Sequence, residues 1–248
     1  MSSGALRSQP GEGAQTARAS PGVGSTIIPR RYGGDIGIRP LLSIPHMVQE
    51  LGGDPSAIFD RVGIDLEVFE NADSRVAFDA LGRLLDEAAT SLNCPHFGLA
   101  FAPHFELSGL GPVGYLMRNE RSVGAALRSL VLHLHLHDRG SVAGIERIDN
   151  RSVMLTYAIY HRNTPAADII YDGAIAIACK ILRTLCGQRW KPSAVHLSRG
   201  KPRNVRPYRE FFGLLPRFDA TQSGVLLDAS WMGRPIEGAD PALHALLT

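Results

Sequence analysis

Three histidines that alternate with leucines have the spacing best suited to metal chemistry. On a β-strand, His133, His135 and His137 would share one face and could bind a metal ion together. On an α-helix, only His133 and His137 are neighbours, and two histidines without a third ligand are a poor structural zinc site. The surrounding pattern is helical and therefore predicts no metal site. The histidines are then partly buried or helix-end residues, or one of His133 and His137 donates a hydrogen bond into a ligand pocket.

Three glycines match the spacing of the dinucleotide-binding fingerprint, G-x-G-x-x-G. They are Gly109, Gly111 and Gly114. That motif binds a pyrophosphate where it follows a β-strand and opens a helix in a βαβ unit. Here the next elements are helical and Pro112 lies inside the motif. Tight turns and close helix packing explain these glycines better, so no cofactor is predicted.

A basic stretch contains no acidic residue between Asp172 and Glu210. One interpretation is a solvated surface. The other is an anion site, for a carboxylate ligand or for DNA phosphate. The basic residues are Lys180, Arg183, Arg189, Lys191, Arg199, Lys201, Arg203, Arg206 and Arg209.

The sequence contains no recognisable catalytic motif, so an enzyme is not expected. It has no nucleophile elbow, no HExxH helix and no paired acids in a motif context. A formal net charge of +2 points to neither nucleic acid nor membrane. No run of roughly 18 apolar residues could span a bilayer. The three cysteines are too few for a disulfide framework, and reduced thiols are typical of a cytoplasmic protein.

A helix that begins after Ser122 contains the three histidines, and Ser122 is a suitable N-cap for it. Leu132 and Leu136 lie on the side opposite the main apolar stripe, so the last turns are apolar nearly all round. This predicts a central core helix that is buried on more than one face. The stripe itself is Val123, Ala126, Leu127, Leu130, Val131 and Leu134.

The N-terminal half is predicted to be helical after a flexible tail. Residues 1–40 are rich in Gly, Ser, Pro and Arg, with almost no apolar pattern, which is typical of a tail. Asp54 and Pro55 are an N-cap and a first helical residue, and Gly63 ends that helix. Residues 97–101 alternate and are expected to form a short strand or a tight turn. The other expected helices are 44–51, 66–69 and 76–92.

The apolar period changes from 3.6 to 2 after the central helix. This predicts strands at 142–148 and 152–160, with both faces of the second strand covered, and a helix from Pro165 to about residue 185. The fold class is therefore α+β, with an antiparallel sheet of about four to five strands covered by helices. Further short strands are expected at 194–197, 216–218 and 224–227, and a helical turn at 208–212.

Several segments resemble, in order, the N-terminal sensor region of AraC/XylS-type bacterial transcription regulators, the arabinose-binding-like subgroup. They are LGGDP at 51–55, VGID at 62–65, CPHFGL at 94–99, LGPVGYL at 110–116, SVGAALRSL at 122–130, YREFFG at 208–213 and ADPAL at 239–243. The resemblance implies that residues 41–248 are a ligand-sensing and dimerisation domain. It also implies a small-molecule effector, a homodimer, and DNA binding only through a C-terminal helix-turn-helix domain that this chain does not contain. No membrane partner is implied.

A sensor needs an apolar pocket with a few placed polar groups, here between the central helix and the sheet. We expect Tyr115, His133 and Tyr157 to supply hydrogen bonds in one such pocket. Tyr157 and Tyr160 lie on opposite faces of their strand, so at most one can face it. The alternative is that all three are core residues whose polar tips reach the backbone. The alternative function is a stand-alone small-molecule-binding or enzymatic α+β domain with no role on DNA.

Overall fold

The computed structural model describes residues 34–161 and 163–247. Two short strands, β1 (Asp35–Gly37) and β2 (Arg75–Ala77), pair antiparallel beside the helices of the first half. Those helices are η1 (Arg39–Leu41), α1 (Ile44–Glu50), α2 (Pro55–Val62), η2 (Leu66–Phe69), α3 (Phe78–Ser91), α4 (Phe97–Phe101), η3 (Ala102–His104), η4 (Leu107–Leu110), α5 (Pro112–Arg118) and α6 (Val123–His137).

The second half supplies the main sheet, whose strand order is β3-β4-β6-β5 with antiparallel neighbours. The predicted α+β class and the strand number are thus confirmed. Residues 216–218 do not form a strand, because Arg217 makes only an isolated bridge to His196. The elements are β3 (Ser141–Arg147), β4 (Ser152–Ile159), α7 (Ala167–Cys186), β5 (Ala194–His196), α8 (Arg206–Phe212), β6 (Ser223–Asp228), η5 (Ala229–Gly233) and α9 (Pro241–Leu247).

Capping residues mark the ends of several helices, and Asp54, Gly63 and Ser122 do so where the sequence predicts. The Asp54 carboxylate accepts a hydrogen bond from the Ser56 N–H, and Gly63 has a left-handed φ of 69°. The Ser122 hydroxyl accepts from the Ala125 N–H at the start of α6. The Asp240 carboxylate accepts from the first turn of α9. Local polar chemistry is therefore enough to place these boundaries.

Three further local predictions are wrong. Residues 34–40 belong to the folded part, since β1 pairs with β2 and Ile36 and Ile38 are buried; residues 1–33 lie outside the described residues. The helix expected at 76–92 begins at Phe78, because Val76 pairs within β2. Residues 97–101 form α4, not a strand or turn. A Cβ atom on Gly98 would overlap the Ile169 carbonyl oxygen, so α4 packs closely on α7, and this packing favours the helix.

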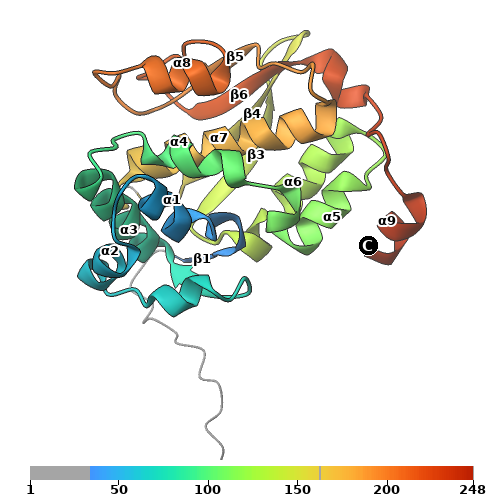
Figure 1. Ribbon diagram of the computed structural model, residues 1–248. Coiled ribbons are helices and arrows are strands. Elements are labelled where there is room, and N and C mark those ends of the chain that lie inside the picture. Colours follow the sequence, from blue (N-terminus) through green and yellow to red (C-terminus); the bar gives the residue numbers. More distant parts are fainter. Residues whose placement is uncertain (1–33, 162, 248) are drawn as a thin grey trace, which may run out of the picture.

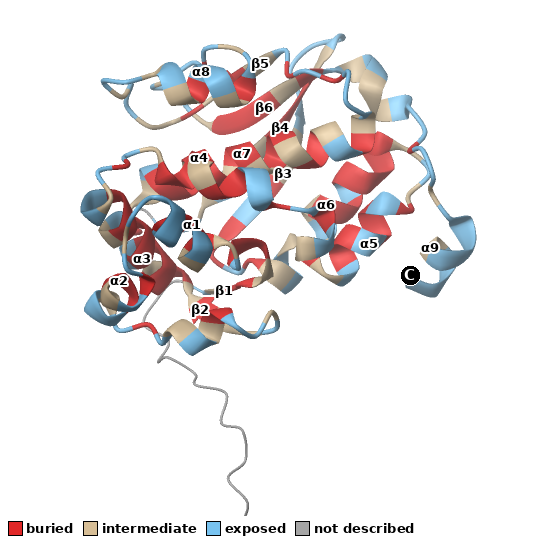
Figure 2. Cartoon of the chain, viewed as in Figure 1, coloured by how far each residue is buried: buried red, intermediate tan, exposed pale blue. Residues whose placement is uncertain are grey.

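Helix α7 is the central element (Figure 1). It contacts β4 and β6 on one side and α3 and α4 on the other. Helix α6 lies beside it, and its last turns are not buried on two faces as predicted: Leu132 is 67% exposed and Leu136 is 53% exposed. No other described element covers that side of α6, whose buried residues are confined to its first half (Figure 2).

One face of the main sheet is covered by helices and the other is largely open. Val153 and Leu155 are buried on the face toward α7. Ala158 and Tyr160 on the other side are exposed, which contradicts the expected cover on both faces of β4. Two apolar cores form, one in the helical half and one beneath the sheet, and Tyr157 and Ile177 contact both. The junction of the two cores is where a cavity lies.

The glycine-rich turn before α5 is explained by packing and backbone geometry, as the sequence predicts. Gly111 has a φ of 59°, and a Cβ atom on Gly114 would overlap the Leu107 carbonyl oxygen. We expect Gly114→Ala to lower the free energy of unfolding by about 2 kcal/mol net, because overpacking costs roughly 3 kcal/mol and alanine's helix propensity returns about 1. Gly109→Ala is the matched control, since its Cβ would lie 3.5 Å from the nearest atom. Urea unfolding of both variants checks this, and equal effects would contradict it.

Candidate ligand cavity

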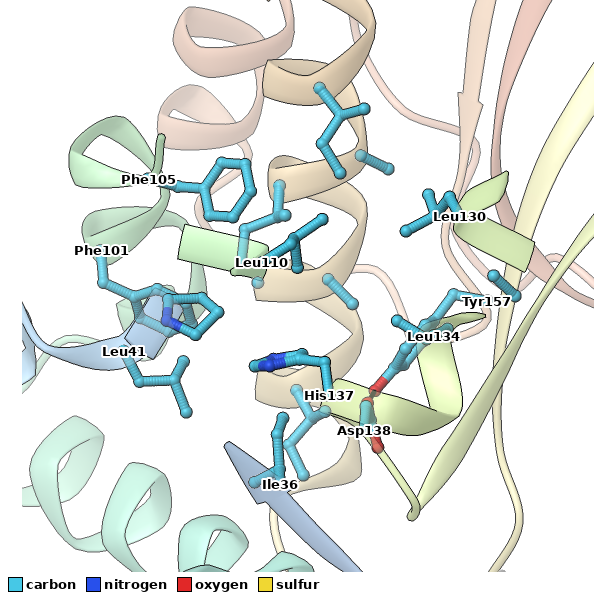
Figure 3. A pocket seen from close by; sticks show the side chains of 18 of the residues that line it. Ile36, Leu41, Phe101, Phe105, Leu110, Leu130, Leu134, His137, Asp138 and Tyr157 are labelled. Atoms are coloured by element: carbon cyan, nitrogen blue, oxygen red, sulfur yellow. Dashed lines mark hydrogen bonds between the residues drawn. The ribbon is translucent and has the colours of Figure 1, made fainter. Parts of the chain in front are cut away.

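A cavity of about 110 Å³ lies between α6, α7, β4 and the helical half. Figure 3 shows Leu130 and Leu134 of α6 on one side of it, and Phe101 and Phe105 on the other. Ala174 and Ile177 of α7 also line it. Nearly all the surface is hydrocarbon, because the two apolar cores meet here without filling the space between them. Such a lining is typical of a site for a small apolar molecule.

The three residues predicted to share one pocket lie at three different places. Tyr157 lines the cavity. Tyr115 is 51% exposed on α5 and borders a surface hollow. His133 borders another hollow, and its Nδ1 lies 2.9 Å from the carbonyl oxygen of Ser129. The shared pocket is therefore wrong, because Tyr115 borders a hollow beside η3 and η4, His133 borders one beside α9, and Tyr157 borders the cavity under the sheet. A ligand contact by Tyr157 stays a prediction.

His137, the second histidine that the sequence offers for such a pocket, is the one that faces the cavity. Figure 3 shows its imidazole projecting inward from the end of α6. The same side chain borders a surface hollow beside Arg39 and Arg75, so it forms part of the wall between cavity and surface. Burial, together with the nearby Arg75 cation, lowers the pKa of His137 to about 4. The imidazole is therefore neutral at pH 7.

Arg75 holds the end of α6 in place. Its guanidinium donates to the carbonyl oxygens of Leu136 (3.1 Å) and His137 (2.9 Å). Its Nε donates to the Asp35 carboxylate at 2.8 Å. A cation that hydrogen-bonds the last carbonyls of a helix stabilises that end. The β1–β2 pair thus fixes the position from which His137 enters the cavity.

Asp138 is a buried carboxylate directly after α6, and it lines the cavity. It accepts hydrogen bonds from the Gly140 N–H (2.8 Å), the Ser141 hydroxyl and the Tyr157 hydroxyl (2.9 Å). Burial raises the pKa of Asp138, although these donors favour its charged form. Burial and the neighbouring Asp138 raise the pKa of Tyr157, so its hydroxyl keeps its proton. The sequence reasoning missed Asp138; the only available signal was an acid followed by Gly140 at the end of a helix.

We expect Tyr157→Phe to lower the free energy of unfolding of the ligand-free protein by about 1–2 kcal/mol, because Asp138 loses one of its donors in a buried place. The control is Tyr160→Phe, since Tyr160 is exposed and should change stability by less than about 0.5 kcal/mol. Thermal or urea unfolding measures both. Unchanged stability of Tyr157→Phe would mean that the hydrogen bond to Asp138 contributes nothing to folding.

The basic stretch does not line the cavity. Most of its members are exposed, as a solvated surface predicts. Arg199 belongs to a buried cluster: its Nη1 donates to the fully buried Asp172 carboxylate and, at 2.7 Å, to the Tyr208 hydroxyl. Tyr208 donates to the same Asp172 oxygen at 2.6 Å. Within the described residues no group of three or more His, Cys, Asp or Glu side chains could hold a metal ion, and no helix could cross a membrane.

An apolar cavity enclosed between a helical layer and a sheet is typical of domains that bind small molecules. The model of a known family, the arabinose-binding domain of AraC transcription regulators (N-terminal), matches residues 52–236. The chain belongs to this family. The resemblance to AraC/XylS-type sensors is thereby confirmed, although the ADPAL segment at 239–243 lies outside the matched residues.

Relatives of the chain are transcription regulators. It is 28% identical to the HTH-type transcriptional regulator VirS of Mycobacterium tuberculosis, over 82% of this chain and 60% of VirS. It is 22% identical to the ornithine utilization regulator of Pseudomonas aeruginosa, over 79% of this chain and 58% of that protein. The fold resembles that of the transcriptional regulator CdpR from Pseudomonas aeruginosa, with a TM-score of 0.54 and 19% identity over 62% of this chain and 50% of that one. The chain thus spans about three fifths of the curated relatives it matches.

Proposed function

We propose that this chain is the effector-sensing part of an AraC-type regulator and that a small molecule binds in the cavity between α6, α7 and β4. The observation that carries the proposal is the cavity itself, which is apolar, lies where two cores meet, and contains a neutral histidine. Membership of a family described as a ligand-binding domain supports it. Because the relatives are transcription regulators, we propose a regulatory role for the chain and not a catalytic one.

The DNA-binding activity belongs, in this proposal, to a helix-turn-helix domain outside this chain, and the regulator works in the cytoplasm, where the DNA is. Support comes from the name of VirS, which is an HTH-type regulator, and from the part of its length that this chain leaves uncovered. Effector binding would favour one of two conformations that the DNA-binding domain responds to.

A contiguous set of contacts links α6 to α9. The Ser129 hydroxyl of α6 donates to Glu120, whose other oxygen lies 3.4 Å from His244 of α9. The Asn119 side chain accepts from the Asp240 N–H at 2.9 Å. A movement of α6 at the cavity would therefore change the contacts that hold α9. These contacts support a coupling between the cavity and α9.

We further propose that the chain forms a two-fold dimer through the exposed side of α6, where Leu132 and Leu136 lie one turn apart. Light scattering at tens of micromolar should give a dimer for the wild type and a monomer for Leu132→Arg. Leu215→Arg is the control, since Leu215 is exposed elsewhere on the surface and should leave the dimer intact. A wild-type monomer, or a dimer unchanged by Leu132→Arg, would contradict this interface.

A screen of small metabolites by thermal unfolding tests the effector proposal. A ligand that binds only the folded state stabilises it by about 2.7 kcal/mol at a concentration of 100 times its dissociation constant. We expect at least one compound to raise the unfolding midpoint in a concentration-dependent way. A broad library in which no compound does so would contradict the proposal.

A further inference from the structure

We propose that the cavity selects an uncharged, mostly apolar molecule about the size of one aromatic ring, and that its single polar group hydrogen-bonds the His137 imidazole. This inference rests on the proposed function, because it assigns a chemical class to the molecule that the cavity binds. Three observations support it: the residues that line the cavity, the hydrogen bonds that its polar side chains already make, and the volume of the cavity.

The charges around the cavity exclude an ionic ligand. No lysine or arginine of the described chain lines it, so a carboxylate or phosphate would meet no cation. Among the described residues that line the cavity, Asp138 is the only carboxylate, and its oxygens already accept from Gly140, Ser141 and Tyr157. Burying an unpaired charge in such surroundings is far more costly than burying a neutral group.

His137 is the side chain in the described lining that can still both donate to and accept from a ligand. Thr156 lies on β4 next to Tyr157, so its side chain points to the opposite face of the sheet. The Tyr157 hydroxyl donates its proton to Asp138. No side chain or backbone group of the described residues hydrogen-bonds the His137 imidazole, which projects into the cavity (Figure 3). With its pKa lowered to about 4, the neutral ring offers one donor and one acceptor.

A sugar does not suit this arrangement, although the family description names arabinose. Each hydroxyl group of a buried sugar needs a hydrogen-bond partner, and one imidazole cannot serve several hydroxyl groups. The volume of about 110 Å³ is comparable to the cavity of roughly 150 Å³, lined by Leu, Ile and Phe, that binds benzene in another protein. A single ring with one hydroxyl or carbonyl group therefore suits both the space and its polarity.

Titration calorimetry with four probes tests the class. Phenol and toluene have nearly the same shape, and only phenol carries a hydroxyl; benzoate adds a charge and L-arabinose adds several hydroxyl groups. We expect phenol to bind about fivefold more tightly than toluene, which is one hydrogen bond of roughly 1 kcal/mol, and we expect no measurable binding of benzoate or arabinose at pH 7. In His137→Leu, phenol should bind no better than toluene. His133→Leu is the matched control on the same helix and should keep the difference.

The outcomes separate this inference from the proposed function. Equal binding of phenol and toluene by the wild type, or a difference that survives in His137→Leu, overturns the role of His137. If His137→Leu does not fold, His137→Phe replaces it and is held to the same criterion.

Preferential binding of benzoate or arabinose that Ala174→Leu abolishes overturns the chemical class and leaves the cavity as the effector site. Phenol binding that persists in Ala174→Leu places the site elsewhere and overturns both. If none of the four probes binds, the class is overturned, while the metabolite screen still judges the proposed function.

Discussion

Ala174→Leu is expected to abolish the stabilisation that a bound effector gives, while the ligand-free protein stays as stable as the wild type. Ala174 lines the cavity from α7, so a leucine there would fill the space that the ligand needs. Filling a cavity with hydrocarbon commonly stabilises a protein or leaves it unchanged. The wild type should gain about 2.7 kcal/mol at 100 times the dissociation constant of the best stabiliser, and the variant less than about 0.5 kcal/mol. Thermal unfolding with and without the compound measures both.

The matched control is Thr184→Leu, which places the same side chain on an exposed part of the same helix. It should respond to the effector like the wild type. An Ala174→Leu variant that is folded and still fully stabilised by the compound would show that the ligand binds outside this cavity.

Arg199→Met is expected to destabilise the protein by about 3–5 kcal/mol at pH 7.5, the usual cost of removing one partner of a buried ion pair. Asp172 is fully buried, and its Oδ2 accepts from both Arg199 and Tyr208. Its Oδ1 has no hydrogen-bond partner among the residues that the structure describes. The variant would leave the carboxylate with the Tyr208 hydroxyl as its remaining donor. Arg203→Met is the control, since Arg203 is exposed and belongs to the same basic stretch.

The cost of Arg199→Met should depend on pH. Burial raises the pKa of Asp172 to about 6, so its contribution to stability is present below its ordinary value near 3.8 and is lost as the pH rises through about 6. Without Arg199 the pKa rises further, and more stability is lost over the same range. Unfolding at pH 5 and pH 7.5 should therefore give a smaller cost at pH 5. An equal cost at both, or one below about 1 kcal/mol at pH 7.5, would contradict this account of the pair.

The fold was predictable where local chemistry decides it. Asp54 and Ser122 cap helices through their own side chains, and the change to a two-residue period in the sequence indicates the strands β3 and β4. The exceptions depend on distant elements. Helix α4 is short and almost wholly buried, so its apolar residues carry no helical period. Leu136 is exposed because no described element packs on that side of α6. The apolar pattern of a helix does not show which neighbouring elements pack against it.

The site was less predictable than the fold. The two-residue period of β4 puts Tyr157 and Tyr160 on opposite faces of the sheet. Tyr157 lines the cavity because its face is the one that α7 covers. His133 and His137 lie one turn apart on the same side of α6, so choosing between them required knowing which turn of the helix borders the cavity. Asp138 lines the cavity only because Gly140, Ser141 and Tyr157 supply its hydrogen bonds there, and two of these donors come from the turn and strand that follow α6. Such a network exists only in the folded structure.

A crystal structure of the protein with the compound that stabilises it most tests the central claim directly. We predict that the compound lies in the cavity, in contact with Leu134 and Ile177, with its polar atom within hydrogen-bond distance of the His137 imidazole. A compound found instead in the hollow beside Tyr115 or in the one beside His133, with the cavity empty, would contradict it.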